Sequence, residues 1–181
     1  MLPVFLIGYM GCGKTTLGEA LAAAMGVRYI DLDECVEARC GQSVVQIFEE
    51  RGEAGFRELE NEALREVASL TDVIVGCGGG TPCHGDNMPL MNQAGVTVWL
   101  TTSPERLTAR LLLPEQKAKR PKFVNLPDEA FLSVVQQELS ERTPHYSQAQ
   151  LQFDSTDIET AEATRRTALR LAALLQGLHG R

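Results

Sequence analysis

With 181 residues, 44% of them hydrophobic and 23% charged, the chain has the length and composition of one soluble globular domain that buries a sizeable core. Its formal net charge of −7 argues against a nucleic-acid-binding surface, which would need a basic stripe. An acidic protein that binds an anionic ligand must gather its cations locally, so single lysine and arginine positions carry information.

The cysteine count and the hydropathy pattern indicate where the protein works. An odd set of five cysteines lacks the spacing of a disulfide framework: Cys12, Cys35, Cys40, Cys77 and Cys83. A zinc site built from the last four is not favoured, because neither a CxxC pair nor paired histidines accompany them. No run of about 18 apolar residues and no signal-peptide pattern is present. We therefore expect a cytoplasmic monomer that binds neither nucleic acid nor membrane.

The first predicted elements are a buried strand over residues 2–7 and a helix over residues 14–25. Between them lies the segment GYMGCGKT, from Gly8 to Thr15, which Thr16 follows. A strand, a glycine-rich turn and a helix in this order are the setting of a phosphate-binding P-loop. The alternative, a glycine-rich turn that only joins two elements, is disfavoured by this flanking pattern.

The residues of this segment suit a nucleoside triphosphate with its metal ion. The glycines allow a tight turn whose backbone N–H groups converge on one anion, and the helix N-terminus adds donors. Lys14 has the length to reach the β- and γ-phosphates, and the Thr15 hydroxyl suits the coordination shell of Mg²⁺.

Strands and helices alternate along the rest of the chain. We predict strands over residues 28–32, 72–75, 96–100 and 151–154, and helices over 35–40, 53–70, 87–93, 104–113, 128–146 and 159–175. Ser43 and Gln46 form a capping-box pattern that opens one more helix before Gly52. Residues 114–127 are basic, carry three prolines and have no period, so they predict a mobile loop. This alternation predicts one α/β domain whose parallel sheet is covered by helices on both faces and binds ligands at its carboxyl edge.

Two carboxylates follow the second predicted strand. Asp31 and Asp33 are two residues apart, so their side chains would point to the same side if the strand continued. One carboxylate beside a P-loop can hold Mg²⁺ through water, and a deeper one can accept the proton of an attacking hydroxyl. Alternatively, Asp33 only caps the helix that follows.

The third predicted strand runs into Gly78-Gly79-Gly80, with no acidic residue at its end. Three glycines after a strand can bring backbone N–H groups close to a small polar ligand. A plain connecting loop is the alternative.

Cations stand at three places that could serve such a site. Arg57 precedes Glu60 by three residues on a predicted helix, so the carboxylate could orient the guanidinium toward a substrate carboxylate. A solvated surface ion pair is the alternative. The local pattern around Arg142 does not by itself assign it a role. We expect His84 and His145 to be structural or surface residues. The predicted loop over residues 114–127 carries a basic cluster that suggests a lid on the phosphates or, alternatively, a loop kept soluble: Lys117, Lys119, Arg120 and Lys122.

Together these motifs resemble those of bacterial shikimate kinases over essentially the whole chain. The matching segments are Gly8 to Thr16, Asp31-Leu32-Asp33, Phe56-Arg57-Glu58-Leu59-Glu60, Gly78-Gly79-Gly80, Arg120-Pro121 and Arg142-Thr143-Pro144-His145-Tyr146. The P-loop alone names a superfamily, whereas the phenylalanine–arginine and triple-glycine signatures after Asp-x-Asp are far more specific.

The resemblance implies a three-layer α/β/α fold of the nucleoside monophosphate kinase type, with a five-stranded parallel sheet and a mobile lid. It implies a single domain over residues 1–181, with a lid over about 113–126 and a shikimate-binding helical segment over about 33–61. The implied reaction is ATP-dependent phosphorylation of the 3-hydroxyl of shikimate, in chorismate and aromatic amino-acid biosynthesis.

The resemblance also implies roles for individual residues. ATP would be bound by Gly11, Cys12, Gly13, Lys14, Thr15, Thr16, Arg110 and Arg120. Shikimate would be bound by Asp33, Arg57, Gly78, Gly79, Gly80 and Arg142. Mg²⁺ would be held by Thr15 and, through water, by Asp31. Asp33 would be the catalytic base, while Lys14 and Arg120 stabilise the transferred phosphoryl group. This chain departs from the family where Lys122-Phe123 replaces the leucines that usually follow the lid Arg-Pro.

The rival hypotheses are another small-molecule kinase of the same class and, from a different class, a nucleotide-binding switch or regulator. A gluconate kinase-like enzyme shares the P-loop, but its polyol acid would not specifically call for Phe48 and Phe56 beside Arg57. A GTPase-like switch would need an Asn/Thr-Lys-x-Asp guanine motif, which the sequence lacks. A non-catalytic nucleotide-binding regulator is the least favoured, because every position expected to carry chemistry is filled.

Overall fold

A computed structural model describes residues 1–118, 121–124 and 126–179 of the chain. Its centre is a parallel sheet of five strands in the order β2-β3-β1-β4-β5. The strands are β1 (Val4–Ile7), β2 (Arg28–Asp31), β3 (Val73–Gly76), β4 (Val96–Thr101) and β5 (Leu151–Asp154). This arrangement confirms the predicted five-stranded parallel sheet.

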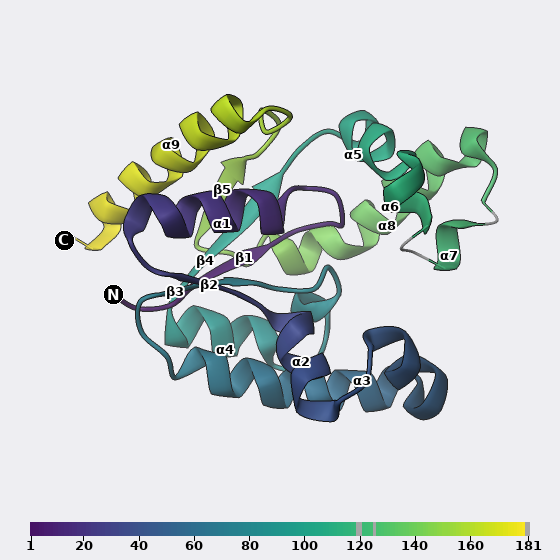
Figure 1. Ribbon diagram of the computed structural model, residues 1–181, viewed down its shortest axis with the longest axis horizontal. Coiled ribbons are helices and arrows are strands. Elements are labelled where there is room, and N and C mark those ends of the chain that lie inside the picture. The colour runs from purple at the N-terminus through teal and green to yellow at the C-terminus, as the bar shows by residue number, and fades with distance from the viewer. Residues whose placement is uncertain (119–120, 125, 180–181) are drawn as a thin grey trace.

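Helices connect the strands and cover both faces of the sheet or gather at its end. They are α1 (Lys14–Met25), α2 (Leu32–Cys40), α3 (Val44–Ala68), α4 (Asn87–Ala94), α5 (Pro104–Leu111), α6 (Pro114–Ala118), α7 (Pro121–Val124), α8 (Phe131–Tyr146) and α9 (Ala161–His179), with 3₁₀ turns η1 (Thr81–Cys83) and η2 (Asp128–Ala130). Figure 1 shows α1 and α9 together on one side of the sheet and α3 and α4 on the other. Helices α5 to α8 gather at the end toward which β1 points.

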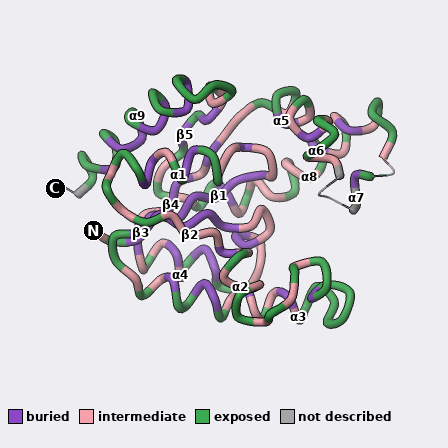
Figure 2. Tube along the Cα trace, viewed as in Figure 1, coloured by how far each residue is buried: buried purple, intermediate pink, exposed green. Residues whose placement is uncertain are grey.

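The centre of the sheet is buried because β1 and β3 carry continuous apolar runs, whereas the edge strands β2 and β5 are mostly accessible. All four residues of β1 and all four of β3 are buried, as expected for central parallel strands with helices on both faces. Figure 2 shows this burial along the central strands, whereas the outer face of α9 is exposed. Parallel strands need crossover connections, and the helices provide them.

The strand register sets the position of the carboxyl edge. In the ladder, Asp31 pairs with Gly76, and Gly76 pairs with Leu6 on the other side. The chain therefore leaves β1, β2 and β3 at nearly the same level, and the segments that follow these strands meet at one edge.

Local capping signals were predicted correctly around α3. The Ser43 side chain accepts a hydrogen bond from the Gln46 backbone, and the Gln46 side chain accepts one from the Ser43 backbone, which completes the capping box. Gly52 has φ 67° and ψ −176°, so two helical segments meet there at a kink. A positive φ of this kind is readily available to glycine.

Two local predictions were wrong. The strand predicted over residues 28–32 ends at Asp31, and α2 begins at Leu32 rather than at Cys35, because the Asp31 side chain caps the helix. The segment over residues 114–127, predicted to lack regular structure, contains α6 and α7. Phe123 of this segment is buried, with its ring centroid 5.0 Å from that of Phe131.

Within the described residues, no helix has the length and apolar character that crossing a membrane requires.

Candidate active site

The P-loop has the geometry that its glycines predict. Gly8, Gly11 and Gly13 have φ values of 143°, 81° and 93°. A Cβ on Gly8 would lie 2.6 Å from the Leu100 carbonyl oxygen, so a side chain there would collide with backbone. Lys14 begins α1, and its Nζ donates to the carbonyl oxygens of Gly8 at 2.8 Å and Tyr9 at 3.0 Å.

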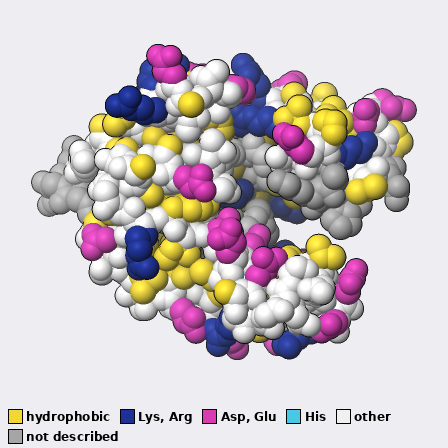
Figure 3. All heavy atoms as spheres, in the orientation of Figure 1, with side chains coloured by type: hydrophobic (Ala, Val, Ile, Leu, Met, Phe, Trp, Pro, Cys, Tyr) yellow, Lys and Arg dark blue, Asp and Glu magenta, His cyan; other side chains and the backbone are white. Residues whose placement is uncertain are grey.

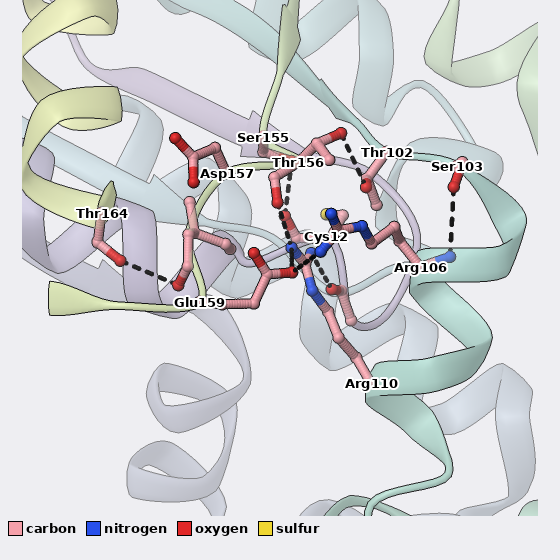
Figure 4. Close-up of polar contacts among 12 residues, drawn as sticks. Cys12, Thr102, Ser103, Arg106, Arg110, Ser155, Thr156, Asp157, Glu159 and Thr164 are labelled. Atoms are coloured by element: carbon pink, nitrogen blue, oxygen red, sulfur yellow. Dashed lines mark hydrogen bonds and ion pairs between the residues drawn. The ribbon is translucent and has the colours of Figure 1, made fainter. Parts of the chain in front are cut away.

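Other elements hold the P-loop from outside. The Ser155 hydroxyl donates to the Cys12 carbonyl at 2.8 Å, and Arg110 Nη1 donates to the Gly11 carbonyl at 3.0 Å. Arg110 Nη2 also donates to the Thr156 carbonyl and to the Glu159 carboxylate, at 2.8 and 3.1 Å. Figure 4 shows Arg110 reaching from α5 toward Cys12 and the segment after β5. The predicted ATP-binding residue Arg110 thus lies beside the predicted phosphate loop.

Asp31 and Asp33 occupy different elements. Asp31 ends β2 and caps α2, with its Oδ1 accepting from the Asp33 N–H at 3.0 Å, whereas Asp33 lies in the first turn of that helix. The strand does not continue to Asp33, so the condition under which the two side chains would share a side is not met. The alternative that Asp33 is the cap is wrong, because the cap is Asp31, two residues earlier. Burial, together with the negative charges of Asp31 and Glu60, raises the pKa of Asp33 to about 6, against the opposing effect of Lys14 and Arg57.

The predicted magnesium ligands are the Thr15 hydroxyl and, through water, the Asp31 carboxylate. The described residues contain no group of three or more histidine, cysteine or acidic side chains that could hold a metal ion. Mg²⁺ in kinases does not need such a group, because it binds through one or two carboxylates, waters and the phosphates of the nucleotide. Asp31 raises the pKa of Asp33 through like-charge repulsion, which a cation nearby would relieve. The hard oxygen donors present therefore fit Mg²⁺.

The glycine loop after β3, defined as Gly78–Gly80, lies between the other predicted residues. A Cβ on Gly78 would lie 3.2 Å from Asp33 Oδ1, and one on Gly80 would lie 2.5 Å from Arg57 Nη2. A Cβ on Gly79 would lie 3.4 Å from Arg142 Nη1 and 3.6 Å from the carbonyl oxygen of Gly8 in the P-loop. The loop therefore brings the candidate base, both candidate clamp arginines and the P-loop to one place.

Arg57 is held as its spacing predicted. Its Nη1 donates to Glu60 at 2.9 Å and its Nη2 to Glu53 at 3.2 Å, while its Cζ lies 5.2 Å from the Phe56 ring centroid. The Phe48 ring centroid lies 4.6 Å from that of Phe56. The ion pair with Glu60 is not a solvated surface pair, because the Glu60 side chain is 0% exposed.

Arg142 of α8 is bound by residues that sequence reasoning missed. Its Nη2 lies 3.3 Å from Glu138 Oε2, and its Cζ lies 5.3 Å from the Tyr9 ring centroid. The Tyr9 hydroxyl donates to the same Glu138 oxygen at 2.8 Å, and Tyr146 donates to the Gly79 carbonyl at 2.6 Å. The Glu138–Arg142 spacing of four residues was a signal in the sequence.

The predicted lid comprises the segment from α6 to Leu126. Arg120 and Lys119 lie outside the described residues. Lys117 donates to the Asp128 carboxylate at 2.8 Å and to the Leu126 carbonyl at 3.1 Å, so it links α6 to the residues that follow α7.

Figure 3 shows a cleft between α3 and the lobe that carries α5 and α6, with acidic side chains along it. His84 Nε2 lies 3.7 Å from Glu53 at the surface, as expected for a structural or surface residue.

Comparisons with known proteins give one consistent answer. The family model "Shikimate kinase" matches residues 10–172. A shikimate kinase of Bacteroides thetaiotaomicron is 43% identical over 97% of this chain and 99% of its own length, and one of Phocaeicola vulgatus is 48% identical over 88% and 90%.

Solved structures agree with the sequence matches. The crystal structure of the Bacteroides thetaiotaomicron enzyme superposes with a TM-score of 0.91 over 97% of this chain and 98% of its own. A shikimate kinase from Acinetobacter baumannii in complex with shikimate gives 0.81 at 30% identity, over 98% and 94%. A gluconokinase from Sinorhizobium meliloti gives 0.57 at 18% identity over 98% and 95%, which shows a shared fold alone. The chain therefore belongs to the shikimate kinase family.

Proposed function

We propose that this protein transfers the γ-phosphoryl group of ATP to the 3-hydroxyl of shikimate. The observation that carries the proposal is the position of the glycine loop. Gly78, Gly79 and Gly80 adjoin Asp33, Arg142 and Arg57 in turn, and Gly79 also adjoins the P-loop. A small carboxylic acid with hydroxyl groups fits a cleft that has guanidinium groups at one side and a carboxylate at another.

The acceptor is held by its carboxylate. Arg57 and Arg142 form bidentate hydrogen bonds to it, because the planar guanidinium matches the geometry of a carboxylate. Each guanidinium is itself paired with a glutamate, Arg57 with Glu60 at 2.9 Å and Arg142 with Glu138 at 3.3 Å. These pairs hold both guanidinium groups in place before the substrate arrives, which reduces the ordering cost of binding.

The donor is held by the P-loop. The amides of Gly11 to Thr16 and the positive end of α1 bind the phosphates of ATP. Lys14 turns from the carbonyls of Gly8 and Tyr9 to the β- and γ-phosphates. Thr15 and, through water, Asp31 hold Mg²⁺, which when bound neutralises charge on the phosphates. Arg110 contacts adenine, and Arg120 of the lid stabilises the transferred group.

Asp33 is the catalytic base. Its carboxylate accepts the proton of the 3-hydroxyl, the oxygen forms a bond to the γ-phosphorus, and the bond from that phosphorus to the bridging oxygen of ADP breaks. A pKa of about 6 suits this step, because the group is deprotonated at neutral pH and still basic enough to take the proton. We place the enzyme in the cytoplasm as a monomer, within chorismate biosynthesis.

A coupled assay of ADP release tests the proposal. ADP release that depends on shikimate, with little release on gluconate, is the expected result. Gluconate-dependent turnover without shikimate-dependent turnover would favour the gluconate kinase-like alternative. ATP binding without turnover on either acid would favour a non-catalytic regulator.

A further inference from the structure

The partner of Arg57 is a carboxylate that water cannot reach. The Glu60 side chain is 0% exposed, and a buried carboxylate needs hydrogen-bond donors from the protein. Among the described residues these donors are Arg57 Nη1 on Oε2 at 2.9 Å and the Thr81 hydroxyl on Oε1 at 2.6 Å. Each carboxylate oxygen of Glu60 is therefore fixed by a donor from a different element: Arg57 on α3 and Thr81 on η1.

Thr81 is itself held on both sides. Its N–H donates to the Gly78 carbonyl at 3.1 Å, which closes the turn of the glycine loop. Its carbonyl accepts from Asn87 Nδ2 at 2.9 Å, and Asn87 is only 2% exposed. A Cβ on Gly78 would lie 3.1 Å from both Glu60 Oε1 and Thr81 Oγ1, so the bond runs directly beneath this glycine.

We propose that Thr81 is a positioning residue for the substrate clamp, acting through Glu60 on Arg57. The Thr81 hydroxyl fixes the rotation of the Glu60 carboxylate, and the other carboxylate oxygen then fixes the guanidinium. The guanidinium packs against Gly80, the residue that precedes Thr81, so one short segment sets both the position and the partner of Arg57.

Arg57 has an alternative position when the hydrogen bond from Thr81 to Glu60 is lost. Its Nη2 already lies 3.2 Å from Glu53, whose side chain is 62% exposed. Without the bond from Thr81, the Glu60 carboxylate rotates to seek another donor, and Arg57 turns further toward Glu53. Its fork then no longer faces the bound carboxylate, so acceptor binding weakens while phosphate binding at Lys14 is unaffected.

The test compares two substitutions at one position. Thr81→Val keeps the shape but removes the hydroxyl, whereas Thr81→Ser keeps the hydroxyl. The inference rests on the proposed function for its substrate, so the assay is shikimate-dependent ADP release with both substrates varied. We expect Thr81→Val to raise the KM for shikimate about tenfold, to change kcat and the KM for ATP less than about twofold, and Thr81→Ser to restore the wild-type KM.

A double-mutant cycle shows whether the effect passes through Glu60. In a Glu60→Gln background, Thr81→Val should change the KM for shikimate by less than about twofold. An unchanged KM in Thr81→Val alone, or an equal rise in both backgrounds, overturns the inference. Should Thr81→Val not fold, Thr81→Cys takes its place, and its weak donor should give an intermediate KM.

A failure of the proposed function would give a different result from a failure of the positioning claim, because the wild-type enzyme would then release no ADP with shikimate. The positioning claim would be decided by thermal unfolding of the same four proteins without ligand. Strongly non-additive midpoints support the Thr81–Glu60 link, and additive midpoints overturn it.

Discussion

The Asp33→Asn substitution tests chemistry and stability at once. Asparagine keeps the size of aspartate but cannot accept the proton of the acceptor hydroxyl, so we expect kcat to fall by two to four orders of magnitude. ATP binding should stay nearly unchanged, because Lys14 and the P-loop amides hold the phosphates.

The same substitution should stabilise the folded protein at neutral pH. Burial and the charges of Asp31 and Glu60 raise the pKa of Asp33 from 3.8 to about 6 in the folded state. Protonated Asp33 therefore stabilises the folded wild type relative to the unfolded chain at low pH. This stabilisation is lost as the pH rises from about 4 through 6. A pKa difference of about two corresponds to a free energy of about 3 kcal/mol. Asp33→Asn avoids this cost, so its gain over the wild type should reach about 3 kcal/mol above pH 6 and vanish near pH 3.5.

Denaturant unfolding at pH 4, 5, 6 and 8 measures this gain. Glu34→Gln is the matched control, since it removes an exposed carboxylate from the same turn of α2 and should show no comparable pH dependence. The reasoning is refuted if Asp33→Asn retains wild-type kcat, or if its stability relative to the wild type does not increase between pH 4 and 8.

Three further predictions concern the rest of the site. Arg57→Ala should raise the KM for shikimate at least tenfold, whereas Arg65→Ala, on the same helix but paired with Asp86 at the surface, should not; equal effects would place the clamp elsewhere. Gly8→Ala should lower the thermal midpoint by several degrees and abolish most turnover, because its Cβ would meet the Leu100 carbonyl at 2.6 Å; a wild-type midpoint contradicts this. The kcat/KM for shikimate should fall about tenfold per pH unit below about 6, and a flat profile down to pH 5 would exclude Asp33 as the titrating base.

Much of the fold was predictable because its signals are local. Runs such as Val4 to Ile7 are apolar at every position, and Ser43, Gln46 and Pro104 mark helix starts that the structure confirms. Boundaries were less predictable where a side chain decides between two states. Asp31 reads as the continuation of a strand, but its cap on the Asp33 N–H starts a helix at Leu32.

Contacts of the candidate site were predictable where they join residues of one short motif and unpredictable where they are long-range. The pairing of Arg57 with Glu60 followed from a three-residue spacing, and the structure confirms it. The bond from Thr81 to Glu60 joins residues 21 apart, and that from Tyr9 to Glu138 joins residues 129 apart, so neither leaves a local pattern. Such contacts arise only when α3 and α8 pack against the segments that follow β3 and β1.

The central claim is that one cleft holds ATP and shikimate with Asp33 at the reacting hydroxyl. A crystal structure of this chain with shikimate and ADP tests it most directly. We predict the shikimate carboxylate on Arg57 and Arg142, and its 3-hydroxyl within hydrogen-bond distance of Asp33 on the side that faces Lys14. A carboxylate bound away from both arginines, or a 3-hydroxyl out of reach of Asp33, would contradict the account.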